Sequence, residues 1–383
     1  MQGYFDYNAT TPLSDSAREA WLRAQTAHWQ NPSSLYPSAG TVRRLLEDAR
    51  EQFGDLLGCE SDRIVFNSGA TEGCNLVMAH MADPARHVAI SAIEHPCVRE
   101  AAWKWFGHEN VMELPVNKDG LLDLDEAKNL LTAKPPALVA LMAANNETGV
   151  IQPWQAMAQF CRDQQIPFLC DAVQWIGKQP AEALDQCSWA TISAHKFGGP
   201  KGTGMLIIPE DPPRPLHLQV GGPQESGHRG GTENYPNIAA MLAAMEEAVA
   251  HAHVTGQHRD RFEQELRRTI PETRFLGRGS PRLPNTSMVV MPEPGNLKWL
   301  LRLGERGFAV STGSACSAGK QNPSHVMAAM HLEPETMGRV LRFSSGPGTS
   351  AADWQSLADA LLQVSEVLQQ GERSRPRVDL NNL

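Results

Sequence analysis

The chain of 383 residues lacks several features that define whole classes of protein. Its 34 Lys and Arg are outnumbered by 43 Asp and Glu, and the net charge of −9 offers no general attraction for a nucleic-acid backbone. Its seven cysteines show no CxxC spacing, and an odd number does not make a disulfide framework. No apolar run reaches the ~18 residues of a membrane-spanning helix. We therefore expect no nucleic-acid partner and no membrane association.

The start of the chain and its composition indicate a folded protein in a reducing compartment. Residues 1–12 contain Asp6 and lack both the basic start and the apolar stretch of a secretory signal. Hydrophobic residues make up 41% and charged residues 20%, which is ordinary for a globular protein with a sizeable core. At ~150 residues per domain, the length fits two or three domains, or one large domain with a smaller one. We expect a cytoplasmic location, where free thiols stay reduced.

Short aliphatic or β-branched runs alternate with stretches of helical period in the first half of the chain. This alternation predicts crossover units and therefore an α/β fold with a largely parallel sheet. The predicted strands are 63–67, 87–91, 137–142, 167–170, 189–193 and 204–208. The predicted helices are 71–81, 96–106, 124–132 and 153–165.

After about residue 210 the pattern changes, and long helical stretches precede short strands. This mixture predicts a smaller α+β domain at the C-terminus. Its predicted elements are 237–252, 257–269, 287–291, 296–306, 308–311, 338–344 and a closing helix from 351 to about 370.

Lys196 stands in TISAHKFGGPKGTG, residues 191–204, between a predicted strand and a loop rich in glycine. An amine at a strand end can project into a cleft, where a carbonyl cofactor such as pyridoxal phosphate (PLP) can form a covalent link with it. By spacing alone, however, a solvated lysine is the commoner interpretation, and His195 is more often a loop histidine than a ligand.

Two further segments fit the same cofactor. Asp171 follows the apolar run 166–170, where a buried carboxylate could pair with a pyridinium nitrogen, although a helix cap is an equal interpretation. In FNSGATEGCN, residues 66–75, a strand leads into a helix that begins near Ala70 and Thr71. Backbone N–H groups at a helix start, with a threonine hydroxyl, form a phosphate site. The segment matches neither GxGxxG nor the P-loop pattern, which disfavours a dinucleotide or ATP.

Eleven blocks occur in one order along nearly the whole chain. They are FDYNATTP (5–12), NPSS (31–34), SGATE (68–72), EHP (94–96), AANNETGVIQP (143–153), DAVQ (171–174), SAHKFGGPKGTG (193–204), GGPQESGHRGGTEN (221–234), STGSACSAG (311–319), PSHV (323–326) and LRFSSG (341–346). In these blocks the chain resembles the cysteine desulfurases, PLP enzymes of the class V aminotransferase group. The serine-flanked cysteine is similar to that of the subgroup with a long reactive loop.

The resemblance implies the PLP-dependent transferase fold type I, with a mostly parallel seven-stranded sheet in the large domain. The large PLP-binding domain would span 16–209. The smaller α+β domain, with elements of a dimer arm, would combine 1–15 and 210–383, with 236–260 as a candidate bridge between the domains. A homodimer is implied as well.

The resemblance also assigns roles around the cofactor. Lys196 would hold PLP covalently and move the substrate Cα proton, and His95 would stack on the pyridine ring. Asp171 would pair with the pyridinium nitrogen, Gln174 would donate to the phenolic oxygen, and Asn146 would lie close by. The residues expected to hold the phosphate are Ala70, Thr71, Ser193 and His195, with Thr232 from a second subunit. Those expected to bind the substrate carboxylate are Arg342 and Asn31.

Cys316 is the residue that distinguishes this family from aminotransferases. It lies among small residues between Gly313 and Gly319, which favours a mobile loop. By resemblance, its thiolate would take the sulfur of L-cysteine as a persulfide and leave L-alanine. We interpret Cys59, Cys74, Cys161, Cys170 and Cys187 as packing residues, and Cys97, which follows the expected cofactor residue His95, as more often packing than functional.

The predicted function is therefore that of a PLP-dependent cysteine desulfurase that passes sulfur to an acceptor protein, for iron–sulfur cluster assembly or thiolation. A selenocysteine lyase and a non-catalytic sulfur-assembly scaffold are the alternatives; a class V aminotransferase would leave Cys316 without a purpose. No metal site is expected, since His251, His253 and His258 lie without nearby Cys or paired acids.

Overall fold

A computed structural model describes residues 3–210, 212, 216, 219–251, 256–313 and 324–373. Within these residues the largest sheet has seven strands in the order β2-β8-β7-β6-β5-β3-β4. The pairs β3–β4, β3–β5, β5–β6 and β6–β7 are parallel, whereas β8 is antiparallel to both of its neighbours. The strands are β2 (Ile64–Asn67), β3 (Val88–Ser91), β4 (Val111–Leu114), β5 (Leu138–Ala140), β6 (Phe168–Asp171), β7 (Trp189–Ser193) and β8 (Gly204–Ile207).

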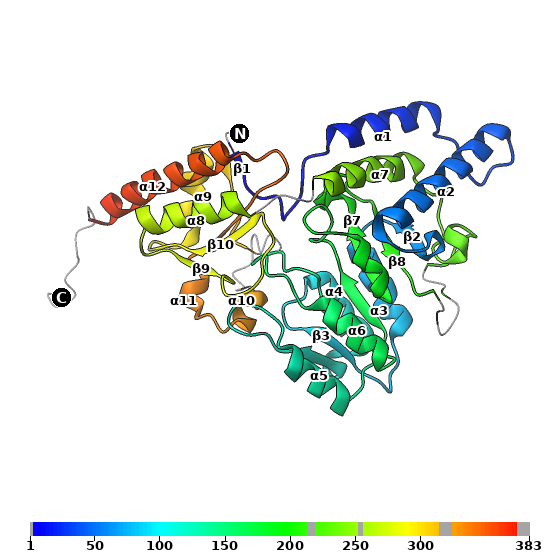
Figure 1. The fold of residues 1–383 in the computed structure, drawn as a ribbon, viewed down its shortest axis with the longest axis horizontal. Coiled ribbons are helices and arrows are strands. Elements are labelled where there is room, and N and C mark those ends of the chain that lie inside the picture. The colour runs from blue at the N-terminus through cyan, green and yellow to red at the C-terminus, as the bar shows by residue number, and fades with distance from the viewer. Residues whose placement is uncertain are drawn as a thin grey trace, which may run out of the picture.

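Helices cover both faces of this sheet (Figure 1). Buried side chains of α3 and α4 share one core with alternate strand residues, and those of α2, α5, α6 and α7 share the core on the opposite face. The helices are α1 (Asp15–Ala27), α2 (Pro37–Leu57), α3 (Ala70–Met81), α4 (Pro96–Phe106), α5 (Leu124–Ala133), α6 (Trp154–Asp163) and α7 (Tyr235–Ala250). The short 3₁₀ turns are η1 (Ser61–Arg63), η2 (His108–Asn110), η3 (Glu182–Gln186), η4 (Ala194–Lys196) and η5 (Glu225–Gly227). The predicted α/β class and mostly parallel sheet are confirmed.

A smaller unit lies beside the first (Figure 1). Its three antiparallel strands, in the order β12-β10-β9, pack against helices around a core that contains Phe262, Trp299, Phe343 and Trp354. Its elements are α8 (Gln257–Thr269), β9 (Arg274–Leu276), β10 (Thr286–Val290), α9 (Asn296–Glu305), β11 (Phe308–Ala309), α10 (His325–Ala329), α11 (Pro334–Met337), β12 (Val340–Ser344) and α12 (Ala351–Arg373). The strand β1 (Gly3–Tyr4) pairs with β11.

The N-terminal segment connects the two units. Phe5 is buried in the core of the smaller unit, whereas Ser14 caps α1 on the larger one. The helix α7 packs on α1 and α2 and contributes its buried face to the core of the large sheet, so residues 235–250 belong to the larger unit by packing. The division into 1–15 with 210–383 and 16–209 stays a prediction. In the part of the chain that the structure describes, no helix is both long and apolar enough to cross a bilayer.

Candidate active site

The expected cofactor residues lie near the carboxyl ends of neighbouring strands. Asp171 is the last residue of β6, and Ser193 is the last residue of β7 beside it. His95 caps the start of α4, a few residues after β3. Because ligands of open α/β sheets bind outside the carboxyl ends of parallel strands, this edge is where a site is expected.

The start of α3 forms a cradle for an anion. The N-cap residue Gly69 has a φ of +135°, and it carries no side chain that could cap the helix amides. The N–H of Ala70 donates to the Ser193 hydroxyl at 2.9 Å, so the two expected phosphate residues touch. His195 Nδ1 lies 3.1 Å from the hydroxyl of Thr10. A cavity of about 370 Å³ is lined by Ala9, Thr10, Ser68, Gly69, Ala70, Thr71, Glu72, Ser193, His195, Lys201 and Gly202.

Asp171 is a buried carboxylate, and a cationic partner would stabilise its charge. It is 6% exposed, and its Oδ1 accepts the N–H of Val173 at 3.0 Å. Burial raises its pKa, while the Val173 N–H and the charge of Lys196 act in the opposite direction. A cationic N–H donor at the other oxygen would favour the ionised form.

His95 is held as a neutral imidazole. Its Nδ1 accepts the N–H of Cys97 at 3.2 Å, which fixes the ring at the start of α4. Burial, followed by the positive charge of Lys196, lowers the pKa of His95 to about 4. At neutral pH the ring is therefore uncharged, and it presents a flat aromatic face together with a nitrogen that can accept or donate a proton.

Lys196 is the last residue of η4, directly after β7. Its Nζ donates to the carbonyl oxygens of Asn8 at 2.7 Å and Ala9 at 2.9 Å. The amide of Gln174 donates to the same Asn8 carbonyl at 2.9 Å. The carbonyl of Asn8 therefore joins Lys196 and Gln174, which lie on opposite sides of β7 in the sequence.

Arg342 lies in the middle of β12 and is 1% exposed. Its guanidinium donates to Asp6 Oδ1 at 2.5 Å, to the Asn146 carbonyl at 2.9 Å and to the Gly313 carbonyl at 3.0 Å. Its Nε is buried with no partner among the described residues. A buried unpartnered N–H costs free energy, so a carboxylate that reached it would bind favourably.

Cys316 lies outside the described residues, but the residues on both sides of its segment are anchored next to Arg342. Gly313 accepts from the Arg342 guanidinium. Ser324 donates its hydroxyl to Glu147 Oε2 at 2.7 Å, and burial raises the pKa of that carboxyl while Ser324 and Arg342 lower it.

Two predicted residues are not brought into this site by the chain itself. Thr232 is exposed and lines a neighbouring hollow with Asn67 and Arg229, which shares Ser68 and Gly202 with the anion cradle, but Thr232 does not line the cradle itself. Asn31 lies in the turn between α1 and α2, and Figure 1 shows this turn on the side of the large unit that faces away from the smaller unit. Both assignments stay predictions, and that of Thr232 requires a second subunit.

Several residues of the site were missed by sequence reasoning. Asp6 and Asn8 lie in the matched block FDYNATTP, so the signal was present, but their partners are far away in the chain. Thr10 and Lys201 line the anion cradle, and Lys201 lies in the block that contains Lys196.

We expect Arg342→Lys to raise KM for an amino-acid substrate with a smaller effect on kcat, since lysine cannot reproduce the planar fork. Charge-assisted hydrogen bonds contribute ~1.5–3 kcal/mol, which corresponds to a roughly ten- to hundredfold rise. Steady-state kinetics would measure it, with Arg302→Lys on the exposed face of α9 as the matched control. An unchanged KM would remove Arg342 from the substrate site.

Comparison with known proteins agrees with this geometry. The family model "Aminotransferase class-V" matches residues 3–357. A cysteine desulfurase of Cereibacter sphaeroides is 37% identical over 374 residues, which are 95% of this chain and 96% of the relative. The cysteine desulfurase IscS of Dictyoglomus turgidum is 35% identical and covers 95% of both chains. A solved NifS-like protein, 29% identical, superposes with a TM-score of 0.85 over 96% of this chain and 100% of its own.

Proposed function

This chain belongs to the class-V aminotransferase family and, within it, to the cysteine desulfurases, and on this premise we propose that it is a PLP-dependent enzyme that converts L-cysteine to L-alanine. The sulfur would pass through Cys316 to an acceptor. The observation that carries the proposal is the convergence of Lys196, a buried Asp171 and a buried Arg342 beside an anion cradle.

The residues present fit PLP group by group. The cradle at Gly69–Thr71 offers helix amides and hydroxyls to a phosphate dianion. Asp171 has one carboxylate oxygen on a backbone N–H, and an anionic partner is what a protonated ring nitrogen requires. When bound, PLP would supply an electron sink that weakens the bonds at Cα and Cβ of the amino acid.

The chain's own residues would bind the substrate and move its protons. Arg342 would take the carboxylate of L-cysteine through Nε and the guanidinium edge. The amine of Lys196 would take the Cα proton and later return it to Cα. His95, neutral because burial and Lys196 lower its pKa to about 4, is a weak base, so it would relay the proton of the substrate thiol without keeping it.

Cys316 would accept the sulfur. The thiolate of Cys316 attacks the substrate sulfur, the Cβ–S bond breaks, and a persulfide remains on Cys316. Cβ takes up the proton that the substrate thiol gave up, and Cα takes back the proton that Lys196 removed, so the organic product is L-alanine. The anchoring of Gly313 to Arg342 and of Ser324 to Glu147 supports this role, because it ties both sides of the segment to the substrate site.

The dimer, the acceptor and the location belong to the same proposal. A second subunit would supply Thr232 to the anion cradle, which is open on its outer side at Thr71. The acceptor would be a sulfur-carrying protein of iron–sulfur cluster assembly or thiolation. The six described cysteines are free, which supports a reducing compartment such as the cytoplasm.

The test is alanine formed from L-cysteine by the purified protein, with PLP and a thiol reductant present. We expect a yellow protein that forms alanine in more than one turnover. A protein that stays colourless with added PLP and forms no alanine would contradict the proposal and favour a scaffold. Alanine formed from selenocysteine but not from cysteine would instead identify a selenocysteine lyase.

A further inference from the structure

Lys178 is a lysine that neither the sequence motifs nor the proposed reaction uses. It lies four residues after Gln174, in the turn that follows β6. The preceding Gly177 has a φ of +72°, and a Cβ there would come within 2.8 Å of Ala248 Cβ on α7. Glycine therefore lets this turn pack against α7, and it directs Lys178 inward.

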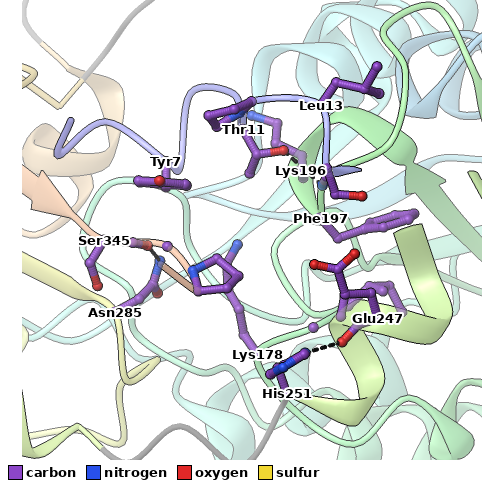
Figure 2. A pocket seen from close by; sticks show the side chains of 18 of the residues that line it. Tyr7, Thr11, Leu13, Lys178, Lys196, Phe197, Glu247, His251, Asn285 and Ser345 are labelled. Atoms are coloured by element: carbon purple, nitrogen blue, oxygen red, sulfur yellow. Dashed lines mark hydrogen bonds between the residues drawn. The ribbon is translucent and has the colours of Figure 1, made fainter. Parts of the chain in front are cut away.

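The Lys178 amine lies in a cavity of about 200 Å³ between the two units. Figure 2 shows the side chain between Asn285 on one side and Glu247 with His251 on the other. Lys196 lines the same cavity, together with Tyr7. Among the described residues no carboxylate lies within ion-pair distance of Lys178.

The contact that Lys178 makes is with Gln174. Its Nζ donates to Gln174 Oε1 at 2.6 Å, while Gln174 Nε2 donates to the Asn8 carbonyl at 2.9 Å. Both ends of this buried amide are thus held by partners of opposite polarity. With Oε1 occupied, the hydrogen that remains on Nε2 is what Gln174 can offer to a ligand, so the amide is fixed as a donor.

The surroundings of Lys178 disfavour its charge. Burial first, then the positive charges of Lys196 and Arg342, lowers its pKa to about 7. Glu247, His251 and Tyr7 are the other titratable groups on the cavity wall. An unpaired amine among other cations destabilises a fold, and groups of this kind concentrate at functional sites.

We propose that Lys178 is a positioning residue that fixes the Gln174 amide as a donor to the cofactor and whose positive charge disfavours a proton on the nitrogen of Lys196. The inference rests on the proposed function. Because the link between Lys178 and Lys196 is a repulsion between like charges, it acts in both directions.

The test is a pH titration of the visible absorption band of the PLP-loaded protein. Without Lys178 the nitrogen of Lys196 loses a positive neighbour, so its proton is held more tightly. We expect the midpoint in Lys178→Met to rise by about half a pH unit or more. The two proteins should differ most in the protonated fraction of the Lys196 nitrogen below pH ~7, where Lys178 is charged in the native protein. This difference should vanish at higher pH. Lys178→Arg keeps the charge and should leave the midpoint at or below the native value.

The control is Lys298→Met, which removes an exposed lysine of α9 and should titrate as the native protein does. A native midpoint in Lys178→Met, with the band and alanine formation of the native protein intact, would overturn the Lys178 proposal alone. A native protein that binds no PLP and forms no alanine would overturn the proposed function, and with it this inference.

A second readout separates positioning from a structural role. A lysine whose pKa falls from 10.5 to about 7 on folding lowers the free energy of unfolding as pH falls through that window. Lys178→Met does not lose this stability. The unfolding midpoint of the variant minus that of the native protein should therefore increase as the pH falls from 10 to 7. A relative decrease over the same range would show that the amine stabilises the fold and would contradict the proposal.

Discussion

Replacing Lys196 by alanine is expected to abolish alanine formation from L-cysteine. The substitution removes both the covalent attachment point and the base at Cα. General acid–base catalysis alone contributes ~10²–10⁴-fold, so the rate should fall by roughly 10³-fold or more. Alanine released in single- and multiple-turnover assays would measure the loss. A rate within about tenfold of native would show that another residue does this chemistry.

Lys196 also donates to the carbonyls of Asn8 and Ala9, so a structural effect has to be separated from a chemical one. Lys196→Arg keeps a permanent cation and its donors but cannot form the covalent link. We expect this variant to be inactive while it retains the unfolding midpoint of the native protein. Lys298→Ala, at an exposed position of α9, is the matched control and should be fully active.

Replacing Cys316 by alanine is expected to stop sulfur release while the bound cofactor and its yellow colour remain. Cys316 lies outside the described residues, whereas the described Gly313 accepts from Arg342 and Ser324 donates to Glu147. The substitution removes the acceptor thiolate and touches none of the groups expected to hold the cofactor. Sulfide and alanine should fall to the level of a protein-free control, whereas the absorption spectrum should match native.

The control for this prediction is Cys59→Ala. Cys59 follows α2, and burial raises its pKa to about 11, so it is a poor nucleophile at neutral pH. This variant should keep native activity. Sulfide released at the native rate by Cys316→Ala would show that the sulfur leaves by another route, and Cys97 beside Asp171 would be the next thiol to test.

Local patterns predicted most of the large unit. The strand β7 and the helix α4, and in the smaller unit the helix α8, have the predicted bounds, because apolar runs and periodicity define them locally and proline or glycine flanks the helices. The helix α1 was missed because its buried residues are the small Ala17, Ala20 and Ala24, which leave no stripe of large apolar side chains.

Two other elements of the large unit were missed for different reasons. The strand β4 was missed because it is a short edge strand in which Glu113 is exposed, so apolar alternation is weak. The helix α2 was omitted although its buried Val42, Leu46, Ala49 and Phe53 recur at helical spacing. The helical pattern of α2 was present in the sequence, and it was not recognised.

Some contacts of the site were predictable from local motifs, and others were not. Ala70 and Ser193 were predicted from separate motifs, and the structure brings them into contact at 2.9 Å. The pairing of Arg342 with Asp6 crosses nearly the whole chain, and no local pattern announces it. Lys178 is only four residues from Gln174, yet its role depends on a cavity wall supplied by α7 and by residues near 285.

The sequence by itself determined most elements of the α/β unit and the family, and it predicted Lys196 and Cys316 as the reactive residues, because periodicity and motif spacing are local properties. Only the tertiary structure decided that Asn8 joins Lys196 to Gln174, that Asp6 holds Arg342 and that Lys178 lines a cavity with no ion-pair partner among the residues the structure describes. These contacts form because the N-terminal segment lies between two hydrophobic cores, and burial there selects which distant polar groups must find partners.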